Sequence, residues 1–446
     1  MQDNNKNNYG FALFIIGLLF FIFGFITWAN SQLIPYLKIA CQLSSTESYF
    51  VTTAFFAAYF FMSIPSSYVL KKTGFKTGMS VGLFVMALGA VLFIPAAMSR
   101  SYPIFLTGLF IIGSGLALLQ TASNPYAAAL GPKESAARRI SIMGVCNKLA
   151  GIFAVYFLGN IILKDSDAFE VSLKTMDNAA QQLALDGLAH KVILPYIWIT
   201  IAFAAVGLLL LFIKLPNIDD EEEIVNDDNI LSGMQTARTS VWQYPYLIIG
   251  VVALFFYVGV EVISYDTFAG FGQYLGYTLD QSKHFATFTG YTLLAGYFVG
   301  IATMPKLISQ RKALIICVML SIIFTLLAIN LEGEPNMKSL NFWGLNFNLP
   351  THPAVIAFAL LGFSNSLMWP AIFPLAIDGL GKHSKMGSAL LIMAIVGGAV
   401  LPPLYGKLTE TTMNVKSAYI IMIPAYLFIL YFAIAGYKLG KKNINN

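Results

Sequence analysis

The chain has 446 residues, of which 27 are Lys or Arg and 22 are Asp or Glu. Hydrophobic residues make up 57% of it and charged residues only 11%, against about 25% charged in an ordinary soluble domain. A water-soluble globule of this length cannot bury so much apolar surface, so the composition indicates a membrane protein. The apolar stretches are continuous, which excludes the alternating strands of a porin-type barrel. Three scattered cysteines, Cys41, Cys146 and Cys317, form neither a disulfide framework nor a zinc-ligand spacing.

Twelve apolar runs are long enough to cross a bilayer, which takes about 20 helical residues. They fall near residues 10–38, 46–70, 77–99, 103–130, 139–163, 192–214, 244–275, 284–305, 312–331, 353–377, 386–406 and 416–437. We therefore predict an all-α membrane protein with twelve transmembrane helices in two six-helix halves.

The most polar stretch of the chain separates the sixth run from the seventh. Five consecutive acids at 219–223 are followed by Asp227 and Asp228. A run of like charges is typical of a solvated linker. The predicted parts are an N-terminal six-helix half at 1–214, an acidic cytoplasmic linker at 215–243 and a C-terminal six-helix half at 244–446.

The basic residues predict the orientation in the membrane. Of the 27 Lys and Arg, 17 fall in the segments that share a side with the termini, nine fall on the other side, and Lys148 lies inside a span. Cytoplasmic loops carry an excess of Lys and Arg. We expect a multi-pass protein with both termini in the cytoplasm.

The two halves are alike in layout. Gln120 stands five residues before Pro125 in the fourth run, and Asn365 stands five residues before Pro370 in the tenth. Basic turns follow the second and the eighth runs. Two such six-span repeats describe the major facilitator architecture, in which substrate binds near the middle of the membrane and the halves rock around it.

Three charges fall inside the predicted spans and away from their ends, where ionisable groups are functional candidates because they are costly to bury. Glu261 and Asp266 lie well inside the seventh span and Lys148 lies inside the fifth. Five residues apart, the two acids project about 140° apart around a helix and need not face one cavity. We predict an ion-coupling role for all three; the alternative for either acid is a structural ion pair with Lys148.

Neutral polar side chains also fall inside the spans. Amides donate to and accept from hydroxyl pairs, and an indole packs on the apolar face of a sugar ring. These residues predict a site for a neutral sugar, with an alternative in which the amides merely join helices. The candidate substrate-binding residues are Asn30, Gln32, Gln120, Asn124, Asn147, Asn365 and Trp369.

Other functions are disfavoured by what the spans contain. The sequence has no Walker loop, no nucleophile–base arrangement and no metal-ligand cluster, so we expect neither an enzyme nor a cofactor beyond a coupling cation. A drug–proton antiporter and a sugar sensor that signals through the acidic linker remain alternatives. The expected partners are a small sugar and the lipid bilayer, with no nucleic acid, and we expect a functional monomer.

Several segments resemble the fucose–galactose–glucose symporter family of the major facilitator superfamily. They are 24–27 with Asn30 and 33–35, then 119–126 and 130–132, then 257–262, and finally 376–381 and 385–388. The resemblance covers nearly the whole chain. It implies inward sugar transport by cation symport across a bacterial inner membrane, with Gln120, Asn124 and Asn147 lining the sugar cavity.

The chain departs from the fucose branch of that family at two places. Where that branch carries an Asp after the first-span Asn, this chain has Ser31, and where it carries a Glu, this chain has Gln120. The glucose/galactose branch has a Gln there and an acid at the position of Glu261. The resemblance therefore implies glucose or galactose as substrate. Glu261, with Asp266, is the hypothesised replacement for the missing acid, and H⁺ and Na⁺ both remain open as the coupling ion.

Overall fold

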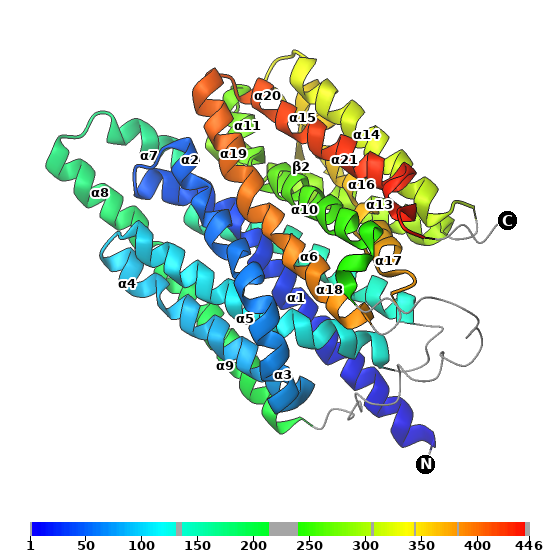
Figure 1. Ribbon diagram of the computed structural model, residues 1–446. Helices are drawn as coiled ribbons and strands as arrows, with labels where there is room; N and C mark the ends of the chain where they lie inside the picture. The colour runs from blue at the N-terminus through cyan, green and yellow to red at the C-terminus, as the bar shows by residue number, and fades with distance from the viewer. Residues whose placement is uncertain are drawn as a thin grey trace.

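The computed structural model describes residues 2–130, 136–213, 240–304, 307–342, 345–380 and 383–441. Most of these residues are helical, and the helices run side by side in one bundle (Figure 1). Within these ranges, 12 helical stretches are long and apolar enough to cross a membrane, which confirms the predicted twelve-span fold. They are Gly10–Ala40, Ser45–Leu70, Lys72–Met98, Tyr102–Ser123, Ile142–Ile162, Asn178–Phe212, Pro245–Asp266, Leu279–Thr303, Gln310–Asn330, Pro353–Ile377, Ala389–Thr412 and Val415–Ile434.

The N-terminal half is built of long helices with short helices between them. Its elements are α1 (Gln2–Ala40), α2 (Ser45–Ser48), α3 (Phe50–Val91), α4 (Phe93–Met98), α5 (Tyr102–Ala129), α6 (Ala136–Ile162), α7 (Ser166–Leu173), α8 (Asn178–His190) and α9 (Ile193–Phe212). Two spans meet inside α3 at Gly74, whose φ of 72° is one that L side chains rarely adopt.

Glycines let the helices of this half approach closely, as small residues do in membrane bundles. A Cβ on Gly82 of α3 would lie 2.8 Å from the carbonyl oxygen of Gly115 in α5. A Cβ on Gly89 would lie 2.7 Å from the carbonyl oxygen of Gly108. Two turns apart on α3, these glycines hold α3 and α5 in backbone contact.

The C-terminal half has more interrupted helices. Its elements are η2 (Val241–Gln243), α10 (Pro245–Asp266), α11 (Phe268–Tyr274), α12 (Leu279–Ser282), α13 (Phe285–Thr303), α14 (Gln310–Asn330), α15 (Pro353–Ala359), α16 (Leu361–Asn365), α17 (Met368–Ile377), α18 (Ser384–Met393), η4 (Ala394–Val396), α19 (Gly397–Thr412), α20 (Val415–Ala418), η5 (Tyr419–Ile421), α21 (Met422–Ile434) and η6 (Gly436–Lys438). Pro370 has no N–H to bond the carbonyl of Ser366, which agrees with the break between α16 and α17.

A short β-hairpin departs from the all-α prediction. Strands β1 (Met337–Phe342) and β2 (Leu345–Pro350) pair antiparallel, with Met337 opposite Pro350 and Phe342 opposite Leu345. Apolar residues alternate with Asn at 340–342 in β1 and at 345–349 in β2, which is the period of a strand and not of a helix. The hairpin lies in the connection from α14 to α15, outside the spans.

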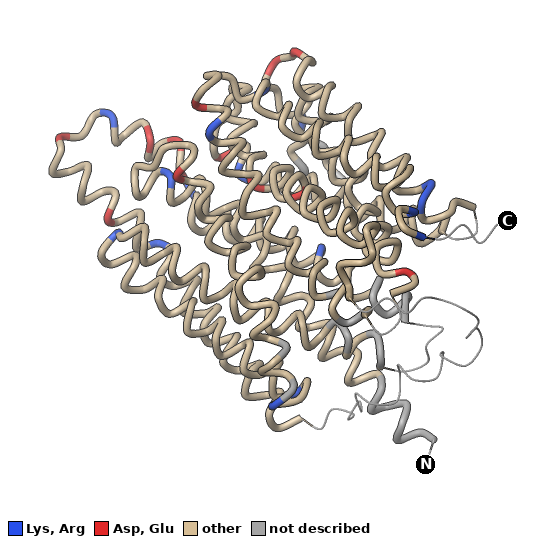
Figure 2. The backbone as a smooth tube through the Cα atoms, viewed as in Figure 1, with Lys and Arg blue, Asp and Glu red and all other residues tan. Residues whose placement is uncertain are grey.

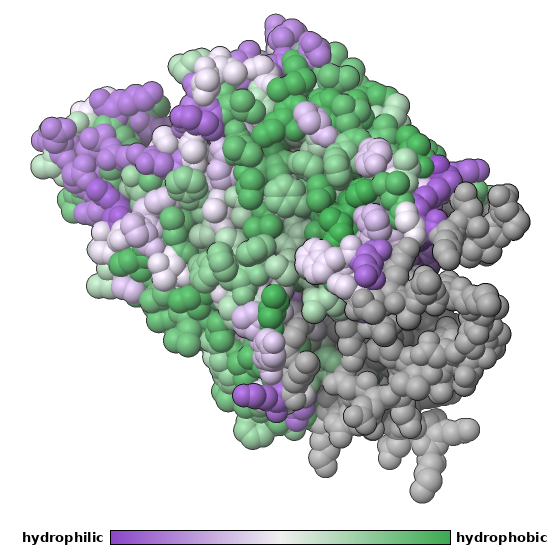
Figure 3. Space-filling model, in the orientation of Figure 1, coloured by the Kyte–Doolittle hydropathy of each residue, from purple (hydrophilic) through white to green (hydrophobic). Residues whose placement is uncertain are grey.

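The bundle has two distinct ends. The first turns of α1 and the last turns of the chain lie at one end, and α2, α7, α8, α11 and α20 lie at the other, here called the far end (Figure 1). Charged residues gather near the ends and leave the long central stretches almost uncharged (Figure 2). The visible face carries a broad hydrophobic belt between hydrophilic areas (Figure 3). This distribution suits a protein that spans a bilayer.

Candidate functional site

Contacts between the two halves close the far end. Both carboxylate oxygens of Asp167 on α7 accept hydrogen bonds from the first backbone N–H groups of α12, from Leu279 at 2.7 Å and from Asp280 at 2.9 Å. Gln32 Nε2 donates to the carbonyl of Lys283 at 2.7 Å. Thr46 donates its backbone N–H and its hydroxyl to Glu410. The halves are therefore joined at this end by hydrogen bonds that must break before they can separate.

A buried ion pair joins the halves deeper in the bundle. Lys148 Nζ on α6 lies 3.0 Å from Glu261 Oε1 on α10, and the two side chains are 10% and 11% exposed. Neither charge is tolerable alone in a membrane interior, so each depends on the other. The ion pair that the sequence left as an alternative is present, and it crosses between the halves.

Aromatic rings enclose this ion pair. Trp28 of α1 stacks on Tyr265 of α10, with ring centroids 3.8 Å apart and planes 29° apart. Lys148 Nζ lies 4.5 Å from the centroid of the Trp28 ring, within cation–π range. Trp28, Lys148, Glu261 and Tyr265 together form what we call the inter-half cluster. Two of its members come from each half, so any movement of the halves alters it.

Asp266 has a different environment from Glu261. It is the last residue of α10, so the prediction that it lies well inside a span is wrong: the helix ends there and α11 follows after Thr267. Asp266 is 3% exposed, and its Oδ2 accepts a hydrogen bond of 2.8 Å from the hydroxyl of Thr52 on α3. The two acids of α10 therefore contact the other half through different partners.

Three predicted residues of the N-terminal half have contrasting surroundings. Gln120 donates to the Tyr59 hydroxyl at 2.9 Å, and Asn147 donates to the Phe20 carbonyl at 3.3 Å. Asn30 is 1% exposed, and neither atom of its amide has a hydrogen-bond partner among the described residues. Buried amides are normally paired, so Asn30 is the amide here with the most unused bonding capacity.

Of the remaining predicted residues, two make contacts within the C-terminal half and one has a side chain that the structure does not describe. Asn365 Oδ1 lies 3.1 Å from both the Ser321 and the Tyr426 hydroxyls, so it joins α14, α16 and α21. Trp369 stacks on Phe373 with centroids 5.9 Å apart. The side chain of Asn124 and residues 215–239 of the predicted acidic linker lie outside the described part of the structure, and the linker's last residues form η2 (Val241–Gln243). Among the predicted site residues, direct contact is found between Lys148 and Glu261.

Three residues that contact Lys148, Glu261 or Asp266, or that stack beside them, were missed from the sequence. Trp28 lies four residues before Gln32, and Tyr265 lies four residues after Glu261, so each shares a helix face with a predicted residue. That spacing was an available signal. Thr52 carried no signal, because a threonine near the start of a span is common and its partner Asp266 is 214 residues away.

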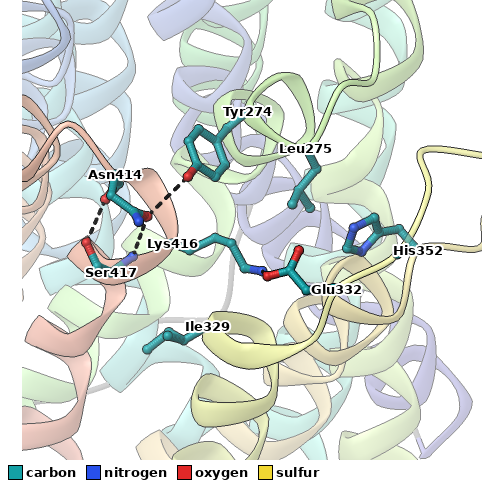
Figure 4. A pocket seen from close by; sticks show the side chains of 9 residues that line it. Tyr274, Leu275, Ile329, Glu332, His352, Asn414, Lys416 and Ser417 are labelled. Carbon is teal, nitrogen blue, oxygen red and sulfur yellow. Dashed lines mark hydrogen bonds and ion pairs between the residues drawn. The ribbon is translucent and has the colours of Figure 1, made fainter.

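A cavity of about 370 Å³ lies at the far end of the C-terminal half (Figure 4). Lys416 Nζ lies 2.8 Å from Glu332 Oε1 across it, and this hydrogen-bonded cation holds the pKa of the Glu332 carboxyl below its ordinary value. Burial, with the nearby Lys416 charge, lowers the pKa of His352, whose Nδ1 accepts from the Ala354 N–H. The lining contains no predicted site residue, so the inter-half cluster remains the candidate site.

Two six-span halves that meet around a buried ion pair define a secondary transporter of the major facilitator type. The sequence profile of the Major Facilitator Superfamily matches residues 16–331. The chain belongs to this superfamily and, within it, to the fucose–galactose–glucose symporter family. It is a multi-pass membrane transporter and not an enzyme.

Named relatives cover almost the whole chain. A glucose/galactose transporter of Brucella abortus (strain 9-941) is 34% identical, over 98% of this chain and 97% of the relative. A putative glucose/galactose transporter of Helicobacter pylori (strain J99) is 32% identical, over 97% and 98%. The crystal structure of a major facilitator transporter, FucP, in the outward conformation has a TM-score of 0.68 and 27% identity, over 96% of this chain and 98% of that one.

Proposed function

We propose that this chain is a secondary active importer of a neutral hexose, glucose or galactose, driven by cation symport. The observation that carries the proposal is the inter-half cluster, in which one ion pair cancels its own charge among aromatic rings. A site without net charge suits an uncharged substrate better than an anion or a cationic drug. The names of the Brucella and Helicobacter relatives support hexose as the substrate class.

We assign the sugar contacts to the amides predicted from the sequence, with Trp369. Asn30 has both amide atoms available, while Gln32 Oε1 and Asn365 Nδ2 each lack a partner among the described residues. Gln120 and Asn147 hold single hydrogen bonds that a sugar hydroxyl can replace. Asn124 and Trp369 complete the proposed set. A hexose hydroxyl both donates and accepts, so it satisfies amides that protein partners leave unpaired.

The proton is the proposed coupling ion, and Asp266 is its proposed carrier. A carboxylate that is 3% exposed and holds one hydroxyl hydrogen bond is costly to keep charged, and protonation removes that cost. Thr52 belongs to the other half, so movement of the halves breaks or re-forms its hydrogen bond to Asp266. Glu261, in contrast, is neutralised by Lys148. We assign the Lys148–Glu261 pair to linking the two halves. All three charges then take part in coupling: Asp266 carries the proton, and the Lys148–Glu261 pair holds the halves together.

Transport then follows alternating access. The halves 1–214 and 244–446, joined by the linker 215–243, rock against each other around the inter-half cluster. Opening the far end breaks the Asp167 cap on α12 and the hydrogen bond from Gln32. The excess of basic residues on the side of the termini supports a cytoplasmic position for both termini in a bacterial inner membrane. We propose that one chain is the functional unit.

Proteoliposomes test this function directly. Purified protein should accumulate labelled galactose or glucose when a proton gradient is imposed, and a sodium gradient alone should not drive accumulation. Asp266→Asn should abolish accumulation but retain exchange of labelled for unlabelled sugar, which needs no net proton movement. Asp186→Asn removes an exposed acid paired with Arg100 and should behave like wild type. Accumulation under sodium alone would refute proton coupling, and efflux of a cationic dye without sugar uptake would favour a drug antiporter.

A further inference from the structure

An aromatic stack crosses between the halves at the candidate site. Trp28 and Tyr265 are 4% and 2% exposed, and their ring centroids are 3.8 Å apart. They belong to a small hydrophobic cluster that is separate from the main core, with Val155 from the N-terminal half and with Ala286 and Leu293 from the C-terminal half. The stack is therefore a contact between the two halves and not part of the main hydrophobic core.

Gly151 and Lys148 of α6 hold the indole of Trp28 in place. A Cβ on Gly151 of α6 would lie 3.0 Å from Trp28 Cγ and closer still to Cδ1, so only glycine leaves room for the ring. Lys148 Nζ lies 4.5 Å from the ring centroid. Trp28 Nε1 is buried and has no hydrogen-bond partner among the described residues. Buried indole N–H groups normally find an acceptor, so this donor points to a ligand that supplies one.

We propose that the face of the Trp28 indole is the platform on which the pyranose ring of the substrate stacks, and that Tyr265 covers this face when no sugar is bound. This rests on the proposed hexose transport. Tyr265 belongs to the other half, so separation of the halves removes it from the indole. The C–H face of the sugar then packs on the ring, and a sugar hydroxyl accepts from Nε1. Sugar and Tyr265 therefore compete for the face of the Trp28 indole. Because the C–H face of a pyranose ring packs on this surface, the platform favours cyclic sugars over open-chain polyols.

Calorimetric titration of the full chain in detergent tests the platform. The ligands are galactose and sorbitol, an open-chain polyol with similar hydroxyls. Trp28→Leu should weaken galactose binding at least about tenfold, because the stacking surface and the N–H donor are both lost. Trp28→Phe keeps a ring and should weaken it about two- to tenfold. The control is Trp198→Leu on α9, a tryptophan that is 63% exposed, which should bind as wild type does.

Tyr265 tests the competition. Tyr265→Leu removes the covering ring and should tighten galactose binding about two- to tenfold, while Tyr265→Phe keeps the ring and should change it little. Weaker binding by Tyr265→Leu would make Tyr265 a wall of the sugar site and overturn the competition. Unchanged binding by folded Trp28→Leu or Trp28→Phe would overturn the platform, as would equal affinity of wild type for sorbitol. Failure of wild type to bind any hexose refutes the proposed function instead.

Discussion

At the scale of single residues, Lys148 and Glu261 are the pair on which the site depends. Both side chains are about nine-tenths buried, and the ammonium and the carboxylate are 3.0 Å apart. Removing one partner leaves the other charge in a membrane interior, whereas removing both leaves a neutral, slightly underpacked site. The two kinds of change therefore have different consequences for stability.

Lys148→Met or Glu261→Gln alone is expected to lower the free energy of unfolding by about 3 kcal/mol. The double variant Lys148→Met/Glu261→Gln should lose much less than the sum of the two single changes. Thermal unfolding of the purified protein in detergent, followed by intrinsic fluorescence, measures all three. Additive losses in the double variant would show that the two charges do not stabilise each other in the folded protein.

Gly151 and Gly144 lie two turns apart on α6 and make a matched pair of substitutions. A Cβ at 151 would meet the Trp28 ring, while a Cβ at 144 would meet no atom within 4 Å. Gly151→Ala is expected to displace the indole and reduce sugar exchange at least about tenfold, and Gly144→Ala to leave exchange and folding intact. Exchange of labelled sugar in proteoliposomes measures both. Equal rates would mean that the indole position is unimportant for transport.

At the scale of elements, two aspartates each cap a helix, but only one of these caps joins the two halves. Asp177 accepts from the Ala180 N–H within its own half, at 2.8 Å, and so caps α8. Asp167 caps α12, which belongs to the other half. Each cap stabilises its helix, but the cap from Asp167 also holds the far end closed.

Asp167→Ala is therefore expected to shift the population toward a structure open at the far end about fivefold, since a cap is worth about 1 kcal/mol. Asp177→Ala should cost a similar stability without opening the far end. Spin labels at Leu183→Cys on α8 and Thr411→Cys on α19, both exposed, report the distance between the halves. A longer distance in both variants, or in neither, would contradict a gating role for Asp167.

The elements also show what a sequence can predict. The spans follow from hydrophobic length alone, and the break in the tenth span follows from Pro370. The hairpin Met337–Pro350 was missed, because two strands of only six residues each stand out little beside twelve long apolar runs. Helices are local structures, whereas the pairing of β1 with β2 depends on residues up to 13 positions apart, Met337 and Pro350.

The site was only partly predictable for a related reason. Charges are rare in spans, so Lys148 and Glu261 were identifiable from the sequence. Aromatic residues make up 14% of the chain, so Trp28 and Tyr265 could be recognised only by their four-residue spacing from Gln32 and Glu261. Whether an amide such as Asn365 binds sugar or joins helices depends on partners 44 and 61 residues away. Such tertiary pairs are not visible in local sequence.

At the scale of the whole molecule, the two ends offer a test of orientation. Leu183 on α8 lies at the far end and Leu307 in the loop after α13 at the other, with exposures of 74% and 78%. With native cysteines replaced by Ser, Leu183→Cys should react in intact cells with a membrane-impermeant maleimide. Leu307→Cys should react only after the cells are opened. The reverse pattern would place the termini outside.

The inter-half ion pair has a consequence for the response to membrane voltage. One elementary charge that crosses 100 mV gains or loses about 2.3 kcal/mol, but two opposite charges 3.0 Å apart move almost no net charge. With Asp266 protonated, the sugar-loaded protein then changes state without sensing voltage. Sugar exchange is expected to be independent of a potential imposed with potassium and valinomycin, while net uptake responds to it. Replacing Lys148 with Met would leave Glu261 as a lone charge and make exchange itself electrically sensitive.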